Sequence, residues 1–212
     1  MATSRRMLTL WRVAVFIAAL APLVYWGWQV AINAAGPEPG RYLLLNIGQG
    51  ILWMLLLTLS LTPLTKLTRW KGFTLIRRQL GLWTLAYAVA HLLCYALFIL
   101  GLDLSRLGSE IVRRPYIIVG MLALVGLIVM GVTSNKWSMR KLGKRWKTVH
   151  KVVYLVLGLG LLHFLWVVRA DLEQWSLYAA AGALLMVLRI PPVARQLPKI
   201  RQLGKRHQGA RA

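Results

Sequence analysis

Long apolar runs without a charged residue divide this 212-residue chain into six segments. The first four are each long enough to cross the ~30 Å hydrocarbon core of a bilayer as a helix, which takes about 20 residues. The last two are shorter, but Lys151 and Arg189 at their ends have apolar stems that reach the interface while the helix continues. The pattern predicts an all-α polytopic membrane protein, a six-helix bundle with spans at residues 13–35, 43–65, 79–101, 115–134, 149–168 and 174–190.

Charge is distributed unequally among the polar segments between these runs. The five acids fall in three segments, with Glu38 in the first, Asp103 and Glu110 in the second, and Asp171 and Glu173 in the third. Five of the 27 Lys and Arg lie beside these acids, and the other 22 lie in acid-free segments that alternate with them. Because short cytoplasmic loops carry the excess of Lys and Arg, we expect a multi-pass protein of the bacterial inner membrane with both termini cytoplasmic. Residues 191–212 are then a basic cytoplasmic tail.

The composition agrees with a membrane protein rather than a nucleic-acid-binding one. The formal net charge of +22 is spread over several short segments beside apolar spans, where it serves orientation and contact with anionic membrane lipids. We therefore expect no nucleic acid as a partner. The single cysteine, Cys94, lies within the third run and cannot form an internal disulfide. No internal repeat is recognisable in the sequence.

Three of the four histidines lie in or at the edge of predicted spans, where an ionisable side chain is costly and usually faces a partner or a cofactor. If the third and fifth helices begin near Gln79 and His150, then His91 lies ~18 Å and His163 ~19.5 Å along them from the cytoplasmic side. Two imidazoles at one depth on different helices are the arrangement that a six-coordinate b-type haem requires. We therefore predict that His91 and His163 ligate haem iron.

A second group lies at the cytoplasmic ends of the same two helices. His150 has no histidine opposite it, only Arg77 and Arg78. These arginines suit haem propionates, a flavin phosphate or lipid phosphate, because a guanidinium forms bidentate bonds to such groups. We predict an inner site at His150, Arg77 and Arg78 that receives electrons from a donor, either through a second, unusually ligated haem or through a flavin.

Several of these residues belong to a recognisable pattern. The segment from Arg77 to Trp83 that leads to His91, and the element Trp146-x-x-x-His150-x-x-x-Tyr154 followed by His163, resemble the ferric reductase-like transmembrane superfamily. The resemblance is closest to its MsrQ (YedZ) family, the haem-binding membrane subunits of periplasmic methionine sulfoxide reductase systems, and covers nearly the whole chain.

The resemblance implies a function and also marks two departures. Relatives carry two histidines on each of two helices and hold two stacked haems, whereas here Arg77 occupies roughly the place of the inner histidine on the third span. Some relatives also carry a cytoplasmic flavin and nicotinamide domain, for which this chain has no room. The resemblance implies one or two b-type haems, with FMN as a further cofactor. It also implies the quinone pool or a cytoplasmic flavin reductase as electron donor, and a periplasmic molybdopterin-containing methionine sulfoxide reductase subunit as partner.

Two other functions remain open at this stage. One is a stand-alone ferric or superoxide-producing haem reductase with a different acceptor. The other is a transporter whose histidines bind a metal ion or relay protons, although no Asp or Glu lies within any predicted span. For the leading interpretation, the surface that docks the periplasmic partner is expected near Glu38, residues 103–114 and residues 171–174.

Overall fold

The computed structural model describes residues 5–169 and 172–196, and this part of the chain is helical, without a β-strand. Two of its elements depart from α-helical geometry: a π-helix, η1, continues α3, and a 3-10 turn, η2, precedes α4. The elements are α1 (Arg5–Ala31), α2 (Pro39–Thr68), α3 (Gly72–Cys94), η1 (Tyr95–Ile99), η2 (Leu104–Arg106), α4 (Leu107–Arg113), α5 (Tyr116–Val132), α6 (Lys136–Leu142), α7 (Arg145–Val149), α8 (Val152–Val168) and α9 (Leu172–Val187).

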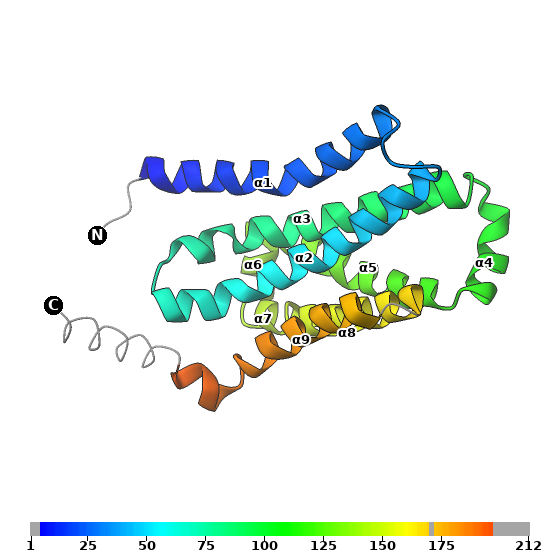
Figure 1. Ribbon diagram of the computed structural model, residues 1–212. Helices are drawn as coiled ribbons and strands as arrows, with labels where there is room; N and C mark the ends of the chain where they lie inside the picture. The colour runs from blue at the N-terminus through cyan, green and yellow to red at the C-terminus, as the bar shows by residue number, and fades with distance from the viewer. Residues whose placement is uncertain (1–4, 170–171, 197–212) are drawn as a thin grey trace.

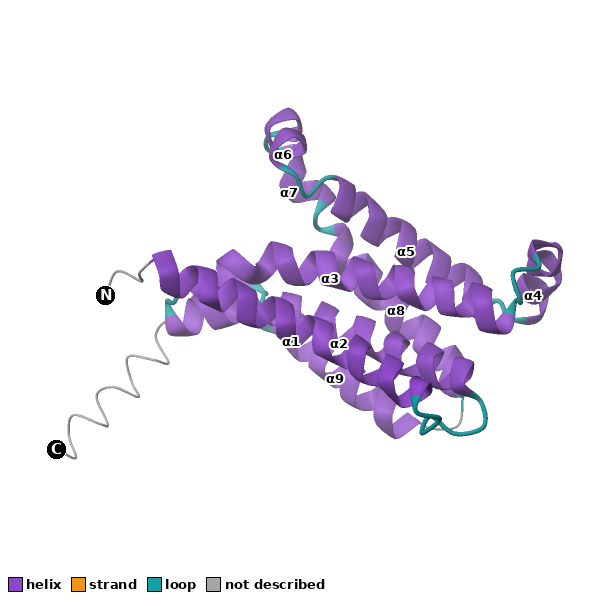
Figure 2. Ribbon diagram, turned by 90° about the horizontal axis from the view of Figure 1, so that it is seen from above, coloured by secondary structure: helices purple, strands orange, loops and turns teal. Residues whose placement is uncertain are grey.

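The long helices form an elongated bundle with α1 on one side, α2 and α3 in the middle, and α8 and α9 on the other side (Figure 1). The start of α1, the α2–α3 turn and the end of the described chain lie at one end of the bundle. Helix α4 and the α1–α2 connection lie at the opposite end in both views (Figures 1 and 2). The acid-free segments therefore lie at one end of the bundle, and the segments that contain Glu38, Asp103 and Glu110 lie at the other.

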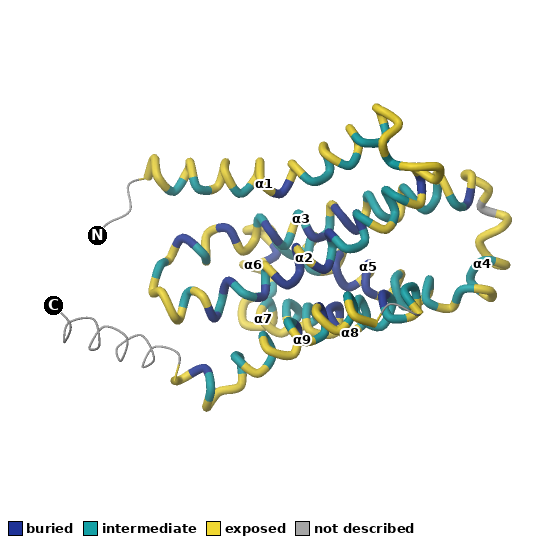
Figure 3. The backbone as a smooth tube through the Cα atoms, in the orientation of Figure 1, coloured by how far each residue is buried: buried dark blue, intermediate teal, exposed yellow. Residues whose placement is uncertain are grey.

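Two antiparallel hairpins dominate the packing, one made of α2 and α3 and the other of α5 and α8. Leu52, Leu55 and Leu59 of α2 are buried against residues of α5 and α8 such as Leu124 and Val156. In Figure 3 most of the buried positions belong to these four helices. Many large apolar side chains elsewhere on the bundle are exposed. Such an outward apolar surface is what a bundle in lipid presents.

Helix α1 packs on α2 and α3 through apolar side chains and three hydrogen bonds, which include those from Trp11 Nε1 to the Gly72 carbonyl and from Gln79 to the Arg12 carbonyl. Tyr87 of α3 is fully buried, and its hydroxyl donates a 2.7 Å hydrogen bond to the carbonyl of Ala19. Gly50 of α2 makes room for this ring, because a Cβ there would lie 2.5 Å from Cε1 of Tyr87. Small residues of this kind let membrane helices approach closely.

Four helices meet the length and hydropathy expected of a membrane span: α1, α2, α3 with η1, and the continuous helix Arg145–Val168. A fifth is reached if α4 and α5, which are bent by 109° relative to each other, count as one span. Together with the family reported below, these helices make the chain a multi-pass membrane protein. Within the described residues α5 has 17 residues and α9 has 16, so neither reaches that length alone.

The observed helices differ from the predicted spans at their ends. The first begins at Arg5 rather than residue 13, and the third at Gly72 rather than residue 79. A charge-free run marks only the part of a helix that lacks Lys and Arg. The helix itself continues through the flanking Lys and Arg, because their long side chains extend to the interface. The acid Asp171, most of the predicted tail at 191–212 and His207 lie outside the described residues.

Candidate functional site

His91 of α3 and His163 of α8 meet between the two hairpins. Their rings lie nearly perpendicular, at 83°, with centroids 6.3 Å apart. Both residues are partly buried and face one cavity. The similar depths inferred from the sequence agree with this meeting of the two rings.

Each of these histidines is oriented by a backbone carbonyl of the neighbouring helix in its own hairpin. Nδ1 of His91 lies 3.0 Å from the carbonyl oxygen of Leu44, and Nδ1 of His163 lies 2.7 Å from that of Tyr116. A carbonyl oxygen only accepts hydrogen bonds, so Nδ1 carries the proton and donates in both rings. Nε2 of each neutral imidazole is then left with its lone pair, as a metal ligand requires.

A glycine lies against each ring. A Cβ at Gly48 would be 3.0 Å from Cε1 and 3.2 Å from Nδ1 of His91. A Cβ at Gly120 would be 2.9 Å from Nδ1 and 3.0 Å from Cε1 of His163. These distances are shorter than ordinary van der Waals contact, so the absence of a side chain lets both rings approach the helix that holds them.

The cavity beside the two rings is large and mostly apolar. Its volume is about 200 Å³, and part of it opens to the outside. Among the described residues that line it, Arg114 is the one with a permanent charge. Its walls come from α2, α3, α5 and α8, with Tyr95 of η1 and Arg114 at the end where α4 lies: Leu44, Leu45, Gly48, Gln49, Ile51, Leu52, Ala88, His91, Leu92, Tyr95, Arg114, Tyr116, Ile117, Gly120, Met121, Ala123, Leu124, Leu127, Gly160, His163, Phe164 and Val167.

Arg114 is fixed by a small polar network at this end of the cavity. Its Nε lies 3.1 Å from Oε2 of Glu110, and the same carboxylate oxygen accepts a 3.4 Å hydrogen bond from the Tyr95 hydroxyl. Because Tyr95 lies in the π-helix that continues α3, this network connects α3 to α4. Arg114 is thereby held in the lining of the cavity.

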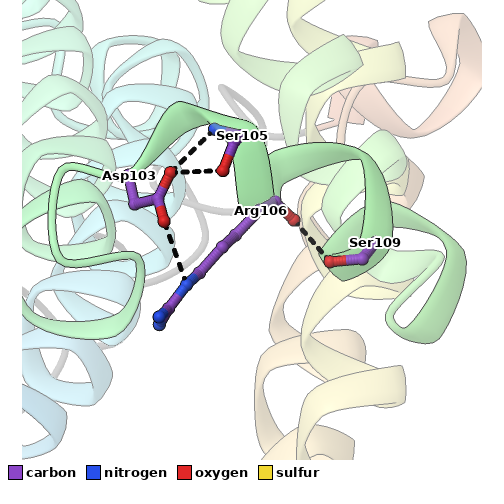
Figure 4. A network of polar contacts seen from close by, with 4 residues as sticks. All are labelled: Asp103, Ser105, Arg106 and Ser109. Carbon is purple, nitrogen blue, oxygen red and sulfur yellow. Dashed lines mark hydrogen bonds and ion pairs between the residues drawn. The ribbon is translucent and has the colours of Figure 1, made fainter.

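A second network stabilises the turn before α4 (Figure 4). The backbone N–H and the hydroxyl of Ser105 donate to Oδ1 of Asp103 at 3.0 Å and 2.5 Å, and Nε of Arg106 lies 3.2 Å from Oδ2. The Ser109 hydroxyl donates to the Arg106 carbonyl at 2.8 Å. The hydrogen bonds from Ser105, and then the charge of Arg106, hold the pKa of the Asp103 carboxyl below its usual value.

The spacing of the two rings fits one metal ion between them. With a metal–nitrogen bond of about 2.0 Å and about 1.1 Å from ring nitrogen to ring centroid, two imidazoles that bind one metal ion from opposite sides hold their centroids roughly 6.2 Å apart. The observed separation is 6.3 Å. Two histidines alone are too few for a bare ion, which takes three or more protein ligands. The described residues contain no group of three or more His, Cys, Asp or Glu that would supply them.

His150 has a different environment. Its Nε2 lies 3.1 Å from the hydroxyl oxygen of Thr133, and its ring is stacked on that of Trp146 with centroids 4.0 Å apart. Nε1 of Trp146 donates a 2.9 Å hydrogen bond to the Thr133 carbonyl. The turn after α5 therefore holds both aromatic rings of the predicted Trp-x-x-x-His element.

Two further side chains join the predicted inner site. Arg189 donates to the Tyr154 hydroxyl at 2.9 Å and to the carbonyl of Leu59, and its Nε is buried without a hydrogen-bond partner in the described part of the chain. Arg77 lies within electrostatic range of Arg189, Tyr154 and His150. Arg78 is exposed, and within the described residues no hydrogen bond or ion pair is found for it.

The structure adds residues that the sequence did not single out. Leu44 and Tyr116 hold the two histidines through backbone oxygens, which the sequence does not reveal, and the Tyr116 ring also packs edge-on against that of His163 with centroids 5.7 Å apart. Gly48 and Gly120 are two of 18 glycines, most of which serve other purposes. Arg114 was counted among charges of the acid-containing side, where nothing in the sequence distinguishes it from Arg113.

Fold and site together define a multi-pass helical membrane protein with a pair of histidines facing one apolar cavity. Residues 47–161 match the family model described as ferric reductase like transmembrane component. The chain is also 34% identical over 204 residues to the protein-methionine-sulfoxide reductase heme-binding subunit MsrQ of Yersinia pseudotuberculosis serotype O:1b (strain IP 31758), covering 95% of this chain and 100% of that protein. The chain belongs to the ferric reductase-like transmembrane family, and within it to the MsrQ branch.

Proposed function

We propose that this chain is the haem-binding electron-transfer subunit of a periplasmic methionine sulfoxide reductase system in a bacterial inner membrane. The observation that carries the proposal is the pair His91 and His163, whose Nδ1 atoms are both engaged by backbone carbonyls while their rings lie at the spacing of two axial ligands. The similar Yersinia protein is a heme-binding subunit by name, which supports the proposal.

The residues around the pair fit a haem better than a bare metal ion. A porphyrin brings four nitrogen ligands of its own, so the two histidines complete a six-coordinate iron. The apolar cavity walls favour a flat hydrophobic ring, and Arg114 in the cavity lining suits a propionate. Haem, when bound, supplies the one-electron redox chemistry, while the protein determines its position, axial ligation and surroundings.

The same ligand count disfavours a metal transporter. A carrier for a bare ion needs ligands to bind it and, for coupling, usually carboxylates. No Asp or Glu lines the cavity among the described residues. A stand-alone ferric or superoxide-producing reductase would use the same histidines, and acceptor assays with the purified protein separate it from the proposed subunit.

For orientation, we propose six crossings with both termini in the cytoplasm. The acid-free basic segments lie at one end of the bundle and the segments with Glu38 and α4 at the other, which supports this topology (Figure 1). Helices α5 and α9 are then the two short spans, extended to the interface by flanking residues. The acid-containing end is the surface that docks the periplasmic molybdopterin-containing reductase.

On the cytoplasmic side, we propose that His150 with Arg77 and Arg78 receives electrons from the quinone pool or a flavin reductase, with FMN or a second haem as the inner cofactor. His150 and His163 are thirteen residues apart on one continuous helix, ~19.5 Å, which is a long gap for a donor to cross unaided. Arg189 and Tyr154 support the inner site, because they contact each other beside Arg77.

A visible absorption spectrum of the detergent-purified protein tests the proposal. We expect a Soret band and the narrow α and β bands of a low-spin b-type haem. His91→Ala and His163→Ala should each remove this haem or convert it to high spin, since an iron that loses an axial ligand becomes five-coordinate or takes up water. His207→Ala is the control and should leave the spectrum unchanged. A colourless protein after haem-replete expression, or unchanged spectra in both His→Ala variants, overturns the proposal.

A further inference from the structure

His91 and His163 are each held by a backbone carbonyl and a glycine, and the spacing of these residues along the chain is the same for both histidines. In each case Nδ1 donates to the carbonyl of a residue 47 positions earlier, on the preceding helix of the hairpin. In each case the glycine that touches the ring stands four residues after that carbonyl, Gly48 after Leu44 and Gly120 after Tyr116. The two supports are thus two copies of one arrangement.

The copies are related by a constant offset of 72 residues, and the offset extends over the whole cavity. Of its 22 lining residues, 20 form ten pairs in which the second member stands 72 positions after the first; Arg114 and Leu127 are the two without a partner. The pairs are 44 with 116, 45 with 117, 48 with 120, 49 with 121, 51 with 123, 52 with 124, 88 with 160, 91 with 163, 92 with 164 and 95 with 167.

This agreement does not come from similar connections. Helices α2 and α3 are joined by a turn at residues 69–71, whereas α5 and α8 are joined through α6 and α7. The spacing from carbonyl to histidine is nevertheless 47 in both. The cavity is therefore lined by two equivalent hairpins, contrary to the expectation from the sequence that nothing repeats.

We propose that the site consists of two copies of one ligand-holding unit, in which Gly48 and Gly120 are positioning residues that give each histidine access to a helix carbonyl. This inference rests on the proposed haem function and deepens it. Each unit comprises a carbonyl and a glycine on one helix, and a histidine preceded by a small residue, Ala88 or Gly160, three positions earlier on the next.

Helix geometry explains why the unit needs glycine. The carbonyl of Leu44 is the one that accepts the N–H of Gly48 in an α-helix, and its second lone pair accepts Nδ1–H of His91. In a helix the side chain of a residue covers the turn on the N-terminal side of its own Cα. Any side chain at position 48 therefore lies over this carbonyl, in the space that the imidazole occupies.

The unit fixes three properties of the ligand at once. It selects the tautomer with the proton on Nδ1, it sets the ring orientation, and it strengthens Nε2 as a donor to the metal. Because both copies use a neutral carbonyl rather than a carboxylate, the two axial ligands are matched in strength.

The test compares Gly48→Ala and Gly120→Ala with two control variants. Gly81→Ala in α3 and Gly158→Ala in α8 change the same residue type in the same helices as the histidines, but a Cβ at either position meets nothing within 4 Å. Alanine is the better helix former, so neither propensity nor helix stability predicts harm at any of the four positions. A loss confined to positions 48 and 120 thus reports the ring contact.

With haem present, we expect the low-spin spectrum to weaken and haem retention to fall roughly 10–100-fold in both test variants, as is typical when a ligand's supporting partner is lost. The effect should be larger for Gly120→Ala, whose Cβ comes nearest to its ring. Parental spectra and retention in both test variants overturn the inference while leaving the haem function intact.

A second measurement works on the haem-free protein. The ¹⁵N chemical shifts of His91 and His163 should report protonated Nδ1 in the parent and in both controls. A mixture of tautomers is expected for His91 in Gly48→Ala and for His163 in Gly120→Ala. If the parent binds no haem but has this tautomer pattern, the proposed function fails and the ligand-holding unit stands. If Nδ1 is unprotonated in the parent, the unit itself is wrong.

Discussion

Thr133 and His150 share a hydrogen bond that defines which nitrogen of His150 carries the proton. The Thr133 hydroxyl donates to the carbonyl of Val129 at 2.7 Å, so its oxygen accepts at 3.1 Å from Nε2–H of His150. This is the opposite tautomer from that of His91 and His163, whose Nδ1 atoms donate. The pair His91 and His163, which the proposed orientation places in the outer half of the membrane, is therefore arranged for metal binding through Nε2. His150, in contrast, must give up its bond to Thr133 before its Nε2 becomes available.

The first prediction concerns this inner histidine. His150→Ala should slow reduction of the outer haem by quinol or a flavin reductase, while the low-spin spectrum that depends on His91 and His163 remains. Stopped-flow reduction with each donor measures the rate. Thr133→Val is the companion variant, because it removes the hydroxyl and leaves the imidazole, and it should not abolish reduction. Parental rates in His150→Ala would mean that donors reach the outer haem directly.

Arg114 provides a second prediction. Arg114→Gln removes the permanent positive charge from the cavity lining, so the reduction potential of the haem should fall by tens of millivolts, since a nearby cation favours the added electron; 59 mV corresponds to about 1.4 kcal/mol for one electron. Spectroelectrochemical titration measures the shift. Arg113→Gln removes the same charge from an exposed neighbour and should change the potential less. Equal shifts in the two variants would argue against a specific role for Arg114.

The buried hydroxyl of Tyr87 is one of the groups that hold α1 on the bundle. Tyr87→Phe should lower the free energy of unfolding by about 1 kcal/mol, because the hydrogen bond to the Ala19 carbonyl is lost while the ring stays in place. Thermal unfolding in detergent should show a melting temperature a few degrees lower. Tyr25→Phe, at an exposed tyrosine of α1, is the control. No difference between the two variants would show that the Tyr87 hydroxyl contributes nothing measurable to the attachment of α1.

The turn in Figure 4 gives a pH-dependent prediction. The pKa of the Asp103 carboxyl is lowered in the folded state from its usual value of 3.8, so its ionised form stabilises the turn. This contribution is fully present above pH 3.8 and is lost as the pH falls through the lower folded-state pKa. An NMR titration of the side-chain carboxyl should give a midpoint below that of a peptide reference. Ser105→Ala should move the midpoint back toward 3.8; an unmoved midpoint would assign the shift to another cause.

Topology is testable by labelling. In a Cys94→Ser background, Ser109→Cys places a thiol at an exposed position of α4, which should react with a membrane-impermeant maleimide from the periplasmic side of intact cells. Lys144→Cys, exposed just before α7, should react only after the cells are opened. Labelling of both in intact cells, or of Lys144→Cys alone, would reverse or abolish the proposed orientation.

The helices and the meeting of His91 with His163 were accessible from the sequence because both rest on simple regularities. Apolar runs give the spans, and 1.5 Å per residue gives the depths. Helix ends were less accessible, since Arg5 and Arg77 sit on helices that continue beyond the charge-free part. The break between α4 and α5 falls at Arg114 and Pro115, because a proline disfavours helical geometry in the residue before it, but the 109° angle of the bend has no signal in the sequence.

The repeat was hidden for a different reason. Only three of its ten residue pairs are identical: Gly48 with Gly120, Leu52 with Leu124, and His91 with His163. The other positions need only be apolar and of suitable size, and any two membrane helices satisfy that requirement. The similarity lies in distances between backbone, glycine and imidazole, which a comparison of side-chain types does not detect.

The division of the paired histidines between two hairpins has a consequence for biogenesis. His91 belongs to the first hairpin and His163 to the second, so neither half of the chain can hold the cofactor alone. Under the proposed function, haem is captured only after the second hairpin has been inserted into the membrane. Haem capture then serves as a checkpoint that distinguishes a completed subunit from a truncated or half-inserted one.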